Sequence, residues 1–174
     1  FEKSIDSLNY YIAKKDFISG LNLARKKAKE YLNAKEYKKF CEISLKKSTI
    51  YYLLNDREKS FENLFEVLKI SEKHNFTKLR IETLQDIGHR YASIFDYNKA
   101  INYYHKSIKV AKKNNLSTEN EFVNQRLFAT YFAMKSDSAF FYLEKVMQNT
   151  RKNGSDKQFS DSYNNYFAYY SHKE

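Results

Sequence analysis

The stretch LQDIGHRYASIFDYNKAINYY, residues 84–104, decides the fold of this chain. Small and apolar residues in its first part keep the three- and four-residue spacing that lines one face of a helix: Leu84, Ile87, Gly88 and Tyr91. Asp96 follows as a helix N-cap residue, able to accept a hydrogen bond from a free N–H of the next helix. Ala100 and Tyr104 then resume the helical spacing. The stretch therefore predicts two amphipathic helices joined by a short turn.

The same cap recurs along the chain. Asp16, Asp56 and Asp96 are 40 residues apart, and each precedes an amphipathic segment. Four residues after each aspartate stands a small residue: Gly20, Ser60 or Ala100. A fourth small residue, Ala139, lies one position out of this frame, which predicts a fourth turn that is one residue shorter.

A second set of signals lies between these caps. Asn75 and Asn115 are also 40 residues apart, and asparagine tolerates the left-handed conformation that ends helices. Thr77 and Ser117 follow them as expected caps of the next helices. Stop and start signals thus alternate roughly every 20 residues, which predicts a series of helical hairpins.

The composition agrees with an all-α fold. Proline is absent and there are 3 glycines, whereas β-sandwiches and barrels need many turns rich in both residues. The single cysteine, Cys41, excludes a disulfide framework. No run of apolar residues is long enough to span a membrane. The chain begins at Phe1 without a signal-peptide pattern, and we expect it to be a fragment of a longer protein.

The pattern Leu84-x2-Ile87-Gly88-x2-Tyr91, followed by Ala100-x3-Tyr104, resembles the tetratricopeptide repeat, or TPR. It departs from the family by lacking the usual tryptophan and proline, and its period exceeds the family's roughly 34 residues, as in long-helix bacterial variants. The resemblance implies a right-handed α-solenoid of stacked antiparallel hairpins with about nine helices in one array. The expected repeats cover about 1–35, 36–75, 77–115 and 118–153, with a terminal helix at 156–172.

In TPR arrays the first helix of each hairpin lines a concave groove, so the resemblance also implies a binding surface. The candidate groove residues are a mixture of amides, acids and aromatics, suited to a peptide or protein partner: Asn9, Glu42, Thr49, Tyr52, Glu82, Gln85, His89, Gln125 and Phe132. Two alternatives remain open, a solvated inner face and a groove filled by other segments of the same protein.

Catalytic, cofactor and metal sites are not predicted. The four histidines, His74, His89, His105 and His172, form no pair at ligand spacing, and the three glycines are too scattered for a phosphate loop. Cys41 lies on an apolar face, which favours a core position over a nucleophile. We therefore expect a chain that is not an enzyme.

The net charge of +10 raises the question of nucleic-acid binding. Half of the excess lies in the first 40 residues, and only six of the 31 basic residues are arginine. We interpret the basic residues as a solvated face and keep nucleic-acid binding through the first hairpin as an alternative. Within residues 1–40 they cluster around the following positions: Arg25, Lys26, Lys27, Lys29, Lys35, Lys38 and Lys39.

The terminal helix carries an aromatic stripe of Tyr163, Phe167 and Tyr170, which predicts self-association as a homodimer. Two alternatives are that a following helix covers the stripe in the intact protein and that the stripe packs on the fourth hairpin as its cap. The leading hypothesis is a non-catalytic protein- or peptide-binding scaffold. By family analogy it would be the sensory or dimerising region of a bacterial signalling or transcription-regulatory protein. A peptide-pheromone receptor module is the alternative within the binding class. We favour a cytoplasmic location, and a removed signal peptide would instead place the repeats in the periplasm.

Overall fold

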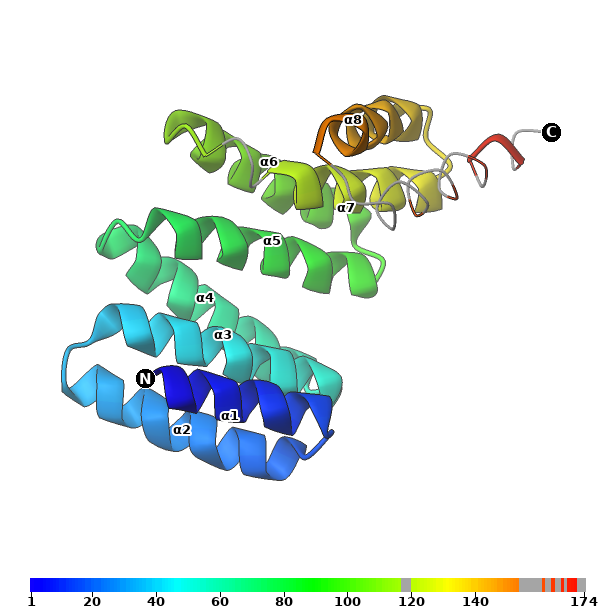
Figure 1. The fold of residues 1–174 in the computed structure, drawn as a ribbon. Coiled ribbons are helices and arrows are strands. Elements are labelled where there is room, and N and C mark those ends of the chain that lie inside the picture. Colours follow the sequence, from blue (N-terminus) through cyan, green and yellow to red (C-terminus); the bar gives the residue numbers. More distant parts are fainter. Residues whose placement is uncertain (117–119, 154–160, 162–163, 165–166, 168, 172–174) are drawn as a thin grey trace. The chain divides into compact units, whose positions relative to one another are not determined.

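The computed structural model describes residues 1–116, 120–153, 161, 164, 167 and 169–171, and these residues are helical apart from short turns (Figure 1). The described residues contain eight helices: α1 (Glu2–Ala13), α2 (Phe17–Asn33), α3 (Tyr37–Leu53), α4 (Arg57–Lys73), α5 (Thr77–Ser93), α6 (Tyr97–Lys113), α7 (Asn120–Ala133) and α8 (Ser138–Asn153). The all-α prediction is confirmed. The ninth helix, expected at 156–172, falls largely outside the described residues.

Two compact units make up the chain, Phe1–Arg90 and Tyr91–Glu174. In the first unit, α2 packs against α1 and α3, and α3 packs against α4. In the second unit, α7 packs against α6 and α8. Successive helices therefore pair as antiparallel hairpins. Within the described residues, no helix combines the length and hydropathy needed to cross a membrane.

The three aspartate caps are confirmed. Each carboxylate accepts a hydrogen bond from the backbone N–H three residues later, at 3.1 Å for Asp16 and 3.2 Å for Asp56 and Asp96. These bonds satisfy one of the free N–H groups at the start of α2, α4 and α6. The 40-residue period of the sequence is thus a period of helix starts.

The turns between helices recur every 20 residues, twice as often as the aspartate caps. Seven residues with positive φ follow one another at intervals of 20: Lys15, Lys35, Asn55, Asn75, Phe95, Asn115 and Lys135. The residue after each one donates its N–H to a carbonyl five positions back, as Asp56 does to Tyr51 at 2.9 Å. This closes the preceding helix with a left-handed residue and reverses the chain. The prediction for Asn75 and Asn115 is confirmed.

Two details of the helix starts were predicted wrongly. Thr77 is the first residue of α5 and not its cap, and its N–H is bonded to the carbonyl of Asn75. The fourth turn is not shorter, because Lys135 keeps the 20-residue frame and α8 begins one residue late, at Ser138. Ser117 lies outside the described residues.

The small residues allow close packing in the first unit. A Cβ atom added to Gly20 on α2 would lie 2.9 Å from Cδ1 of Ile50 on α3 and 3.4 Å from Cβ of Tyr11 on α1. On the next pair, the hydroxyl of Ser48 donates to the carbonyl of Ser60 at 3.0 Å, and that of Ser60 donates to the carbonyl of Ser48 at 3.1 Å. Both serines are fully buried, so α3 and α4 are joined by direct polar contacts inside the core.

The core of the second unit is aromatic. Tyr104, Leu127 and Leu143 are its fully buried centre, with the predicted small residues Ala100 and Ala139 beside them. Tyr131 stacks on Tyr142, with ring centroids 5.3 Å apart. These contacts fix α6, α7 and α8 as one packed group.

Candidate functional site

A cavity of about 250 Å³ opens in the first unit where α1, α3 and α5 approach one another. These are the first helices of their hairpins, the ones expected to line a groove. The lining combines three apolar side chains with five polar or charged ones: Phe1, Ile5, Leu45, Glu42, Lys46, Thr49, Glu82 and Asp86. Such a mixture of apolar surface and a few placed charges is typical of a site for a small ligand or peptide.

Helical periodicity brings these residues together. Glu42, Leu45, Lys46 and Thr49 are three and four residues apart on α3, so they share one face. Glu82 and Asp86 are four apart on α5 and share a face in the same way. The cavity is thus a junction of three helical faces.

Negative charge dominates this cavity. Glu42, Glu82 and Asp86 supply three carboxylates against the single ammonium of Lys46. Partial burial raises the pKa of Glu42, and Lys38 opposes this with a smaller lowering. A carboxylate whose charge is poorly solvated gains from a cationic partner. The cavity therefore favours a ligand that brings a positive charge.

Two aromatic side chains lie one helical turn further along the same faces of α3 and α5. Tyr52 on α3 and His89 on α5 have ring centroids 5.7 Å apart. Beneath them, the guanidinium carbon of Arg90 lies 3.9 Å from the centroid of the Tyr52 ring. Arg90 is 5% exposed, and its Nε donates to Oγ of Ser60 at 3.2 Å. The Tyr52 ring is therefore supported from the core.

The structure brings together most of the sequence-predicted groove residues of the first unit. Glu42, Thr49 and Glu82 line the cavity, and Tyr52 and His89 contact each other. Two others lie on the same helices without lining the cavity: Asn9, exposed on α1, and Gln85, half-buried on α5.

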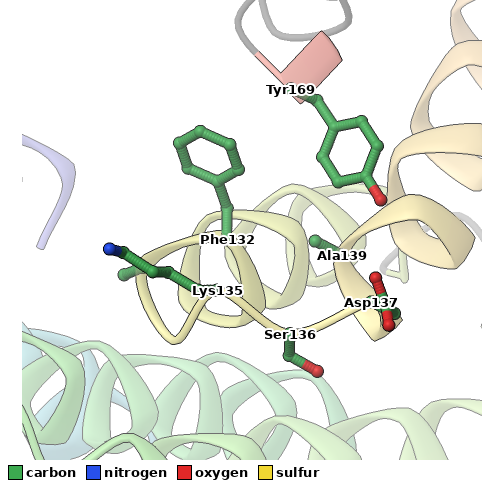
Figure 2. A pocket seen from close by; sticks show the side chains of 7 residues that line it. Phe132, Lys135, Ser136, Asp137, Ala139 and Tyr169 are labelled. Atoms are coloured by element: carbon green, nitrogen blue, oxygen red, sulfur yellow. The ribbon is translucent and has the colours of Figure 1, made fainter. Parts of the chain in front are cut away.

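The two remaining groove candidates belong to the second unit. Gln125 and Phe132 both lie on α7 and are half-buried. Phe132 lines another cavity, of about 480 Å³, at the turn between α7 and α8 (Figure 2). Figure 2 shows Phe132, Ala139 and Tyr169 among the side chains that line this space, and the ring centroids of Phe132 and Tyr169 are 6.4 Å apart. Phe132 thus contributes to a different cavity from the one lined by Glu42.

The aromatic stripe predicted for self-association is described only in part. Tyr163 lies outside the described residues. Phe167 is 72% exposed, and Tyr170 is 41% exposed with its ring edge-on to Phe140 at 6.3 Å. Exposure of Phe167 is compatible with a contact surface, and homodimer formation stays a prediction.

Five cavity residues were absent from the candidate groove residues named above: Phe1, Ile5, Leu45, Lys46 and Asp86. Asp86 lies one turn beyond Glu82, so the spacing of four residues was a signal that could have identified it. Phe1 precedes α1 and carries no periodic signal, so only the packed structure shows that it lines the cavity.

The residues considered for chemistry take structural positions. Cys41 is fully buried, and its burial raises the thiol pKa to about 12, so the thiol stays protonated at neutral pH. His74 stacks on Tyr37 with centroids 4.3 Å apart. Among the described residues, no three His, Cys, Asp or Glu side chains gather as a metal site would require.

Comparison with known proteins gives similarity in structure but not in sequence. No protein-family model matches the chain, and no curated protein matches it by sequence. Aspartyl phosphate phosphatase F from Bacillus subtilis superposes with a TM-score of 0.84 at 20% identity, covering 97% of this chain and 45% of that one. The Rap conjugation gene regulator, solved in complex with a Phr peptide, gives 0.68 at 15% identity, covering 93% and 50%.

A third similar structure is described as having TPR-like repeats. A kinesin light chain of Podosopora anserina with TPR-like repeats gives a TM-score of 0.73 at 12% identity, covering 96% of this chain and 86% of that one. This chain spans half or less of the phosphatase and of the conjugation regulator. At these identities the likeness concerns the fold, and it confirms the resemblance seen in the sequence: the chain has a TPR-like repeat fold, similar in structure to Rap proteins.

Proposed function

We propose that the first unit binds an extended peptide segment that carries a basic side chain, and that the chain is a non-catalytic sensory region of a bacterial regulatory protein. The observation that carries this proposal is the cavity between α1, α3 and α5, which is lined by three carboxylates and three apolar side chains. An extended peptide offers alternating side chains, so one residue can occupy the floor while a neighbour reaches the carboxylates.

The apolar and the acidic side chains of the cavity would bind different parts of a peptide. Phe1, Ile5 and Leu45 offer apolar surface to an aliphatic side chain. Glu42 and Glu82 attract a guanidinium or ammonium group, and charge-assisted hydrogen bonds of this kind are stronger than neutral ones. Binding a cation also offsets the poor solvation that raises the pKa of Glu42.

The comparisons support a binding role by analogy. A similar structure, the Rap conjugation gene regulator, is in complex with a Phr peptide, and another similar structure is named a phosphatase. For this chain, a binding role agrees with the buried, protonated Cys41 thiol, which is unsuited to act as a nucleophile. We extend the peptide-binding role, and not the phosphatase activity, to this chain.

A pair of matched peptides tests the proposal. Fluorescence anisotropy would follow a labelled peptide of alanine and leucine with one central arginine, and a second peptide with citrulline, which is neutral and nearly isosteric, in its place. We expect the arginine peptide to bind at least about tenfold more tightly, since its charge is recognised by carboxylates. Equal affinity of the two peptides would contradict the proposal.

Matched variants locate the binding. Glu42→Gln with Glu82→Gln removes two cavity charges, and Glu58→Gln with Glu62→Gln removes two exposed charges of α4. The cavity variant should lose the preference for arginine while the α4 variant keeps it. If both variants weaken binding equally, only the net charge of the protein matters and the cavity is not the site.

Nucleic-acid binding through the first hairpin remains a separate candidate, and its basic residues are partly neutralised. Lys27 on α2 pairs with Glu30 at 2.7 Å, and just beyond the hairpin Lys39 on α3 pairs with Glu36 at 2.5 Å. Binding of duplex DNA that falls steeply with salt and is lost on Lys26→Glu with Lys29→Glu would favour this candidate over peptide binding.

A further inference from the structure

The helix α6 differs from the rest of the chain in its charge. Residues 97–116 contain five lysines and no aspartate or glutamate. In the first unit, by contrast, several lysines lie beside acids of their own helix turn, as Lys59 does with Asp56 at 2.7 Å. Of the five α6 lysines, only Lys99 forms an ion pair with a described residue, Asp96. The positive charge beyond the first turn of α6 is therefore not balanced locally.

Lys145 on α8 adds a further positive charge near His105 of α6. Oη of Tyr142 on α8 lies 3.5 Å from Nε2 of His105, so side chains of the two helices meet there. Lys145, one turn along α8 from Tyr142, is close enough to lower the pKa of His105, although burial is the larger cause. Lys106 and Lys109 flank His105 on α6, and both are exposed.

Aromatic rings hold two of these ammonium groups in place. Nζ of Lys145 lies 4.2 Å from the ring centroid of Phe141, and Nζ of Lys106 lies 4.6 Å from that of Tyr103. A cation over an aromatic face is attracted to it, which restricts the lysine side chain. A partner therefore meets charges that are already ordered, and less side-chain entropy is lost on binding.

We infer that this face of α6 and α8, formed by the exposed side chains of His105, Lys106, Lys109 and Lys145, docks an acidic segment of another protein. Charge complementarity identifies the partner: the face presents three ammonium groups and one imidazole, and a run of carboxylates is complementary to them. This inference concerns the second unit and does not depend on the cavity of the first.

The same contacts argue against nucleic acid as the partner. The Tyr103 ring stacks on Tyr91, with ring centroids 5.5 Å apart, and Nζ of Lys106 also lies over it, so it is a poor platform for stacking bases. Arginine, the side chain best suited to base edges, occurs only twice in residues 91–174, and one of the two, Arg126, stacks over Phe122 on α7.

The test compares two triple variants with the same change in net charge. Lys106→Glu, Lys109→Glu and Lys145→Glu reverse the proposed docking face, and Lys26→Glu, Lys29→Glu and Lys38→Glu reverse three exposed lysines of the first unit. The probe is a fluorescein-labelled peptide of alternating glutamate and serine, measured by anisotropy at low and at physiological ionic strength. We expect the α6–α8 variant to lose at least about tenfold in affinity and the first-unit variant to lose about twofold or less.

Circular dichroism would show whether each variant keeps its helices. If the glutamate variant unfolds, the three glutamine substitutions at the same positions replace it, with the same order of affinities expected. Equal losses in both variants, or no binding of the wild-type chain at low ionic strength, would overturn the inference. A duplex DNA that binds more tightly than the peptide and depends on the same three lysines would overturn it in favour of nucleic acid.

Discussion

The guanidinium carbon of Arg90 on α5 lies over the Tyr52 ring of α3, 3.9 Å from its centroid. Its Nε also donates to Ser60 on α4, and Ser60 in turn exchanges hydrogen bonds with Ser48. One buried cation thus connects the serine pair in the core to an aromatic ring beside the candidate cavity. The packing of three helices and the position of a groove residue depend on the same side chain.

Replacing Arg90 should therefore affect stability. Arg90→Met keeps most of the side-chain volume but removes the stacking and the hydrogen bond, which leaves Ser60 with one partner fewer. We expect the free energy of unfolding to fall by about 1–3 kcal/mol. Urea denaturation followed by circular dichroism measures this, with Arg57→Met, exposed at the start of α4, as the control. A variant as stable as the wild-type chain would show that the network contributes nothing measurable.

The raised pKa of Glu42 predicts a pH dependence of peptide binding. Burial raises this pKa, so Glu42 loses its charge at a higher pH than an ordinary glutamate does as the solution is acidified. Affinity for the arginine peptide should begin to fall at a pH above the ordinary glutamate pKa of 4.5 as the solution is acidified, while the arginine itself stays charged. Glu42→Gln should bind more weakly at neutral pH and show a flatter profile. An unchanged profile in the variant would exclude Glu42 as the titrating group.

The raised pKa of Glu42 also affects the stability of the folded chain, and this effect is opposite in sign to its effect on peptide binding. A carboxyl whose pKa is raised by folding favours the folded state more when it is protonated, so its contribution to stability is lost as pH rises through the raised pKa. Glu42→Gln should therefore stabilise the free chain slightly at neutral pH while it weakens peptide binding. Thermal melts of the free variant separate these two effects.

The contact of Gly20 with Ile50 predicts a coupled pair of substitutions. Gly20→Ala gains helix propensity of about 1 kcal/mol but forces a Cβ against Cδ1 of a fully buried isoleucine, and overpacking costs about 1–3 kcal/mol. We expect a net loss of stability. Ile50→Val removes that Cδ1 atom and should cost less in the Gly20→Ala chain than in the wild type. A double-mutant cycle with no coupling between the two sites would contradict the packing described here.

His105 predicts an acid sensitivity of the second unit. Burial and, to a smaller extent, Lys145 lower its pKa, so the folded state favours the neutral imidazole. Its contribution to stability is complete above the unfolded value of about 6.5 and is lost as pH falls through the lower folded value. His105→Asn should reduce the loss of thermal stability on acidification. The acidic peptide should have the same effect on the wild-type chain, because nearby carboxylates favour the protonated ring.

The sequence was sufficient for the helices because their ends are encoded locally. Asp16, Asp56 and Asp96 bind backbone N–H groups three residues away, so the cap needs no tertiary contact. The left-handed turns were only partly visible. Asparagine, which tolerates the left-handed conformation, stands at three of these turns, as Asn55, Asn75 and Asn115. Lys15 and Phe95 are not typical of this conformation, yet they adopt it because the helices on both sides impose it.

The candidate cavity was predictable to the extent that it follows helical periodicity. Glu42, Thr49 and Glu82 were expected from their frame and do line it. The contact between Arg90 and Tyr52 could not be predicted from the sequence. The two residues are 38 positions apart, and a charged side chain such as that of Arg90 is expected on the surface. Likewise, the meeting of His105 with Tyr142 depends on how α6 and α8 pack.

The most direct test of peptide binding in the first unit is to map the bound arginine peptide onto the chain by NMR. With methyl-labelled isoleucine and leucine, the account predicts the largest shifts at Ile5 and Leu45, which line the cavity, and none at Leu64, which is buried away from it on α4. Loss of these shifts in the chain with Glu42→Gln and Glu82→Gln would further support binding of the peptide in the cavity. Shifts confined to other methyl groups, with Ile5 and Leu45 unchanged at saturation, would contradict it.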